Sequence, residues 1–81
     1  EEYFQDELED FARVLERIAL RYAAGRLTED NARALVRAQV KSMEIVLLAV
    51  EGMGIIMVEM AINAAIDVAR TTVNEAITKI W

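Results

Sequence analysis

The chain has 81 residues and a net charge of −5, which allows one small domain. It contains no cysteine and no histidine, and this excludes a disulfide framework, a thiolate nucleophile, an imidazole base and the usual zinc site. Hydrophobic residues make up 56% of the chain, which excludes a disordered tail. Acidic residues outnumber basic ones by fourteen to nine, which argues against a dedicated nucleic-acid binder. We therefore expect a non-enzymatic protein without a cofactor or a metal.

An amphipathic helix is predicted from about residue 2 to residue 24. Its apolar residues are spaced alternately four and three apart, as in helices that pack side by side. They are Phe4, Leu8, Phe11, Leu15, Ile18 and Tyr22. Six carboxylates among residues 1–10 favour the helix start, because they interact with the positive end of the helix dipole.

A turn is predicted at residues 25–28. Gly25 supplies a residue that readily adopts the left-handed conformation in which helices end. Thr28 has the side chain of an N-cap, and Glu29 and Asp30 suit the first turn of a following helix. These features predict a helical hairpin that reverses direction here.

The second helix is predicted to run from about residue 29 to 80, and the whole chain, 1–81, to form a single helical domain. Its apolar residues keep the four-three spacing through Gly52 and Gly54 without a slip. Two glycines cost a helix about 2 kcal/mol relative to alanine, which favours a break at 52–54 and a three-helix bundle. The uninterrupted spacing, and the lack of a capping side chain there, favour a continuous or merely bent helix. We expect the long helix and keep the three-helix bundle as the alternative.

A long second helix would leave its C-terminal half uncovered, because the first helix spans only the facing half. An apolar surface of that size does not persist in water. We therefore expect a homo-oligomer in which C-terminal halves share one core. The predicted interface residues are Val50, Gly54, Met57, Ala61, Ala64, Val68, Ile55, Ile62, Ile66 and Val73. The double substitution Ala61→Glu with Ala65→Glu is expected to dissolve this assembly.

Six basic residues form two rows with a spacing of four. They are Arg13, Arg17, Arg21, Arg33, Arg37 and Lys41. Their positions are symmetric about residue 27, so an antiparallel hairpin places them level in pairs. If they share one face, they form a patch for an anionic partner, such as an acidic protein segment. The alternative, which we favour, is a solvated face with pairs to nearby carboxylates, among them Glu29–Arg33.

Four acidic residues, Glu44, Glu51, Glu59 and Asp67, recur along the predicted second helix. Carboxylates can bind divalent metals, but di-iron bundles also need histidine. We expect these carboxylates to keep one face of an apolar helix in water. They also disfavour a spanning segment over 43–66, because a central acidic residue costs about 2.5–3.5 kcal/mol in a membrane. A membrane-associated or pore-forming oligomer stays an alternative.

From residue 22 to 77 the chain resembles a group of small helical proteins of unknown function from phage and prophage regions. The residues that carry the resemblance are Gly25, Arg26, Leu27, Thr28, Glu44, Leu48, Gly52, Glu59, Asn63, Ala64, Ile66, Asp67 and Thr72. The group favours arginine where this chain has Met57 and Met60. The resemblance implies a virion or assembly component and transfers no catalytic residue.

These observations together predict a self-associating structural protein. The alternatives are a monomeric three-helix module that binds an anionic partner through the basic rows, and a membrane-associated oligomer. Residues 1–4 show no features of a signal peptide, so we expect a cytoplasmic or virion-associated protein, trimmed or processed at its start.

Overall fold

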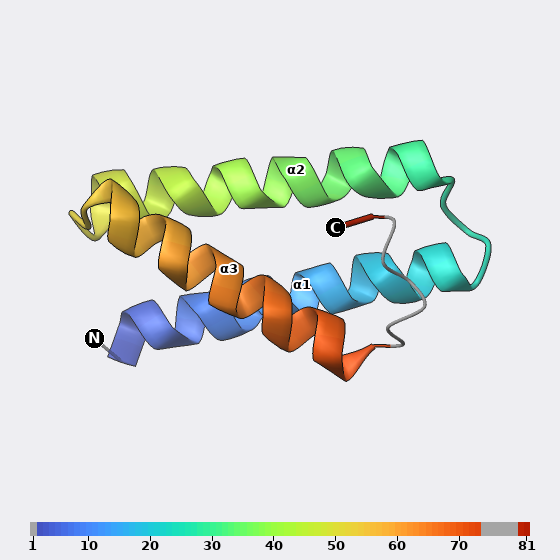
Figure 1. Cartoon of the computed structure of the whole chain (residues 1–81), viewed down its shortest axis with the longest axis horizontal. Helices are drawn as coiled ribbons and strands as arrows, with labels where there is room; N and C mark the ends of the chain where they lie inside the picture. Colours follow the sequence, from blue (N-terminus) through green and yellow to red (C-terminus); the bar gives the residue numbers. More distant parts are fainter. Residues whose placement is uncertain (1, 74–79) are drawn as a thin grey trace.

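The computed structural model describes residues 2–73, 80 and 81, and within them it is all-helical (Figure 1). The helices are α1 (Glu2–Ala23), α2 (Glu29–Ile45) and α3 (Ile55–Thr72), and a π-helical turn, η1 (Val46–Val50), follows α2 directly. Helices α1 and α2 run antiparallel, and α3 packs across both of them. The prediction of an all-helical protein is confirmed.

The connection between α1 and α2 is built as the sequence predicts. Gly25 has φ +77°, and the N–H of Arg26 donates to the carbonyl of Arg21 at 2.9 Å. These are the features of a Schellman motif, in which a left-handed glycine allows the last carbonyls of a helix to be satisfied. The Thr28 hydroxyl then accepts from the backbone N–H of Asn31 at 3.1 Å and caps the start of α2.

The expectation of one long second helix is wrong, and the alternative three-helix bundle fits the structure. A helix over 29–80 would be about 78 Å long at 1.5 Å per residue. The longest extent of the molecule is only 38 Å, because the chain turns back between η1 and α3. The break falls at the glycine pair that the sequence left ambiguous. The part of the long helix predicted over 74–79 lies outside the described residues.

The turn between η1 and α3 resembles the end of α1: a glycine with positive φ is followed by a residue whose N–H donates back to the helix, here across one more residue. Gly52 has φ +69°, and the N–H of Met53 donates to the carbonyl of Leu47 at 3.0 Å, six residues back. The extra residue is taken up by the π-helical turn, where Glu51 N–H donates to the carbonyl of Val46. Gly54 occupies the N-cap of α3 and has no side chain with which to cap it. A missing capping side chain therefore does not prevent a helix start.

One core joins all three helices, and this explains why the chain folds back. Its fully buried large side chains are Leu15 from α1, Leu47 from η1, Val58 from α3 and Ile80 from the C-terminal end. Burying a side chain of this size stabilises the fold by about 1.5–3 kcal/mol. The two large side chains that α3 buries, Val58 and Ile62, together outweigh the cost of two glycines, about 2 kcal/mol. Part of the apolar surface of the C-terminal half is thus covered within the same chain.

Candidate association surfaces

Exposed apolar side chains are concentrated in one part of the molecule. Among the described residues, ten large hydrophobic residues are at least 36% exposed, and eight of them lie between residues 45 and 68. Five of the eight flank the connection between α2 and α3, at one end of the bundle (Figure 1). We call this set the apolar tip; it consists of Ile45, Leu48, Val50, Ile55 and Ile56.

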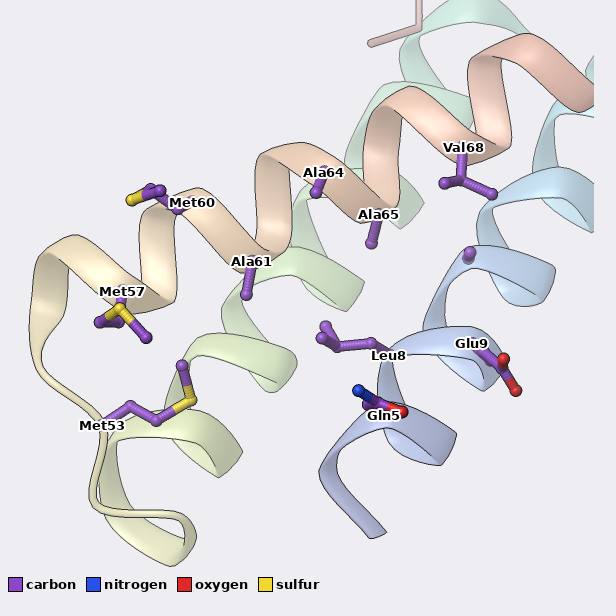
Figure 2. Close-up of a pocket in the computed structure, with 11 residues that line it drawn as sticks. Gln5, Leu8, Glu9, Met53, Met57, Met60, Ala61, Ala64, Ala65 and Val68 are labelled. Carbon is purple, nitrogen blue, oxygen red and sulfur yellow. The ribbon is translucent and has the colours of Figure 1, made fainter. Parts of the chain in front are cut away.

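A second apolar surface lies between the N-terminal half of α1 and the length of α3. We call it the α1–α3 groove, and it encloses about 450 Å³. It is lined by Gln5, Leu8, Glu9, Ala12, Met53, Met57, Met60, Ala61, Ala64, Ala65 and Val68. Figure 2 shows Leu8 facing Ala61 and Ala65 across the groove, with Met53 and Met57 at one end and Val68 at the other. Three of the chain's four methionines line it.

The walls of this groove come from segments that carry negative charge only. The sequence has no lysine or arginine between residues 1 and 12, and none between residues 42 and 69. The same two segments carry ten of the fourteen carboxylates. One of these, Asp10, is paired with Arg13 at 2.9 Å, and another, Asp67, with Arg70 at 3.4 Å. The groove is therefore mostly apolar, and of the charged residues in the described part of the chain, Glu9 lines it while no lysine or arginine does.

The structure divides the predicted oligomer interface into three groups. The first group is exposed: Val50 and Ile55 belong to the apolar tip, and Gly54 precedes Ile55 in the chain. The second group, Met57, Ala61, Ala64 and Val68, lines the α1–α3 groove. The third consists of Ile62 and Val73, which are buried in the core, and Ile66, which packs against it partly buried.

The third group is occupied within the chain, because α3 folds back onto α1 and α2. Ile62 and Val73 therefore offer no surface to a second copy in this arrangement. Ala65 is also only 7% exposed. Ala65→Glu would bury a charge in the core, so the double substitution expected to separate subunits would also damage the fold.

Two of the basic residues on α2, Arg37 and Lys41, point away from α1. All six side chains of the two basic rows are exposed. Gln39 lines a hollow of about 290 Å³ between α2 and α1, so it marks the side of α2 that faces α1. Arg37 and Lys41 are each two residues from Gln39, about 200° around the helix, and so point away from α1.

Ion pairs within single helices account for two of the basic residues. Arg33 is paired with Glu29 at 3.1 Å, as the sequence predicts. Arg13 is paired with Asp10, three residues before it, at 2.9 Å. These arrangements fit a solvated face rather than one six-cation patch. Exposed pairs of this kind contribute about 0–1 kcal/mol each.

The structure bears on the four acidic residues of the C-terminal half and on the predicted alternative of a membrane-spanning segment. There, no group of three or more carboxylates is placed to hold a metal ion. Glu59 and Asp67 are exposed, while Glu44 and Glu51 are half-buried. No helix among the described residues has the length and apolar character needed to cross a membrane.

The apolar spacing does not predict the wall that α1 contributes to the groove, which consists of Gln5, Leu8, Glu9 and Ala12. Leu8 was identified as an apolar position, but its partner across the groove depends on where α3 packs. Ile56 was missed as an exposed apolar residue because it falls outside the four-three spacing. Its apolar side chain at a position outside that pattern was the available signal.

Comparison of the chain with models of protein families, with curated proteins and with solved structures finds no match.

Proposed function

We propose that this protein is a non-enzymatic structural or assembly protein that associates with copies of itself through the apolar tip. The observation that carries the proposal is the exposure of five large aliphatic side chains at one end of the bundle. Val50 is 68% exposed and Ile56 is 71% exposed. Exposed apolar side chains concentrated at one end of a small protein are typical of an interaction site.

The tip is suited to a symmetric contact between two copies. Its residues come from two adjacent segments on either side of one turn, so the same patch on a second molecule offers a self-complementary apolar surface. Aliphatic side chains lose little conformational freedom when they are buried, which favours such contacts. The resemblance to small phage and prophage proteins would place this self-association in the assembly of a virus-derived particle.

Negative charge near the tip opposes this contact, so self-association is expected to depend on the salt concentration. The tip lies in a segment with carboxylates at Glu44 and Glu51 and without lysine or arginine. Two tips that meet bring like charges together, and salt screens this repulsion over a Debye length of about 8 Å at physiological ionic strength. Self-association should therefore strengthen as the salt concentration rises.

The test is the mass in solution, measured by sedimentation equilibrium on the full chain at about 0.05 and about 0.5 M salt. We expect a species heavier than the 9.1 kDa monomer, with a larger associated fraction at the higher salt concentration. Val50→Glu with Ile56→Glu should return the mass to that of the monomer. Both side chains are exposed, so the fold should persist by circular dichroism.

Leu20→Glu is the matched control, because Leu20 is 57% exposed and lies on α1 away from the tip. This variant should associate as the unsubstituted chain does. A monomer at every concentration and salt level, or an unchanged mass in the tip variant, would contradict self-association through this surface.

A further inference from the structure

We infer that the α1–α3 groove is a separate binding site, and that its ligand is a basic amphipathic helix from another protein. This inference goes beyond the proposed self-association, because the apolar tip and the groove are formed by different residues. The groove fits an apolar stripe on a helix. Glu9, together with the absence of lysine and arginine from the residues that line the groove, fits the lysines or arginines that flank such a stripe.

The apolar part of the argument rests on the shape and lining of the groove. Its 450 Å³ falls within the range of about 300–1,000 Å³ that is usual for ligand sites. The α3 wall from Met57 to Val68 is about 17 Å long, which accommodates about three turns of a helix. Ala61 and Ala64 contribute small side chains to the lining, which leave room for a helix backbone to approach.

The methionines give the groove an adaptable lining. Met57 is 59% exposed and Met60 is 64% exposed, so neither is held in the core of this chain. Methionine side chains are unbranched and polarisable, and they adjust to the side chains of different helices. Grooves rich in methionine are used elsewhere to bind amphipathic helices by anchors at i, i+3, i+4 and i+7.

The charge part of the argument identifies the ligand as basic. Both groove walls come from segments without a lysine or arginine, and Glu9 itself lines the groove. The same charge repels nucleic acid and anionic lipid. A second copy of α3 is also a poor ligand, because its own exposed charges are Glu59 and Asp67, with a single cation at Arg70 that is already paired. A helix that has an apolar stripe and flanking cations complements both the apolar lining and the charge of Glu9.

The inference can be tested with a labelled synthetic peptide and the full chain by fluorescence anisotropy. The probe is a helix of leucine and lysine about 18 residues long, since shorter isolated helices are marginal in water. We expect saturable binding that weakens about tenfold between about 0.05 and 0.5 M salt. A leucine–glutamate helix, and a scrambled leucine–lysine peptide without an apolar stripe, should both fail to bind.

Ala64→Lys is the decisive variant, because Ala64 is exposed and lies in the middle of the α3 wall. The added cation should weaken binding of the basic helix by about tenfold or more, as expected for a change at the centre of an interface. Ala38→Lys is the matched control: it makes the same change at an exposed alanine of α2 outside the groove and should bind as the unsubstituted chain does. Circular dichroism checks that both variants fold.

Two further measurements separate this site from the apolar tip. The tip variant, Val50→Glu with Ile56→Glu, should bind the basic helix at least as tightly as the unsubstituted chain. Equal binding of the scrambled peptide, or unchanged binding by Ala64→Lys, would overturn the assignment. So would a finding that Ala64→Lys abolishes self-association while no peptide binds, because the groove would then belong to a second copy of the chain.

Discussion

The two connections of this bundle use the same backbone device but differ in what supports it. Each contains a glycine with positive φ, Gly25 after α1 and Gly52 after η1. The first is followed by a side-chain cap on α2 from Thr28, whereas the second leads to Gly54, which offers no capping side chain. Local sequence is therefore sufficient to specify the first turn, while the second also requires the packing of α3.

Helices α1 and α3 also differ in how much apolar surface they expose. Among the described side chains of α1, from residue 5 onward, Leu20 is the single large hydrophobic residue that is mostly exposed. Helix α3 exposes Ile55, Ile56, Met57, Met60 and Val68. Helix α1 thus resembles an ordinary surface helix, while α3 covers the core with one side and presents apolar surface with the other. Both proposed association sites involve α3 for this reason.

The largest expected effect tests whether η1 belongs to the core as fully as α1 does. Leu15 and Leu47 are both completely buried. Leu15→Ala and Leu47→Ala should each lower the free energy of unfolding by about 2–5 kcal/mol, from lost burial and the cavity left behind. Urea denaturation followed by circular dichroism measures this, with Leu20→Ala as an exposed control that should change little. A loss below about 1 kcal/mol for Leu47→Ala alone would show that the turn contributes little to the core.

An intermediate effect separates the two glycines. No atom lies within 4 Å of a Cβ added at either position, so the cost of alanine comes from the left-handed backbone, about 1–2 kcal/mol. Gly25→Ala should show that loss alone. Gly52→Ala should also favour a continuous helix over the break, since residues on both sides keep helical spacing.

A continuous helix would detach α3 from its own chain and let it pack on another copy, giving an exchanged dimer. Light scattering behind a sizing column measures this in the background of the tip substitutions, Val50→Glu with Ile56→Glu, so that the tip makes no contribution. A Gly52→Ala protein that stays monomeric and as stable as its parent would show that the break does not depend on this glycine.

The smallest expected effects concern the two helix starts. Thr28→Ala should cost about 1 kcal/mol, because the N–H of Asn31 loses its acceptor. Gly54→Ser should stabilise the protein by a few tenths of a kcal/mol, since a serine at this extended N-cap supplies the acceptor that glycine lacks. Both changes are measured by urea denaturation. If both substitutions changed the free energy of unfolding by the same amount and in the same direction, the two helix starts would not differ in their capping as described.

The candidate sites could be predicted in part from the sequence. The spacing identified Met57, Ala61, Ala64 and Val68 as one apolar face, and they do line one groove. The spacing could not show that Ile62, on the neighbouring face, is covered by the same chain. Apolar periodicity states that a face needs a partner, but it does not state whether the partner is in the same molecule.

By itself, the sequence determined the helical character of the described chain, the bounds of α1 to within a residue or two, the turn at 25–28 and the cap at Thr28. These features depend on residues close together in the chain. Tertiary structure decided the break at Gly52, which apolar residues of the C-terminal half were covered within the chain, and which stayed exposed. Those outcomes depend on a balance between the cost of a turn and the burial of α3 against α1 and α2, and that balance involves residues far apart in sequence.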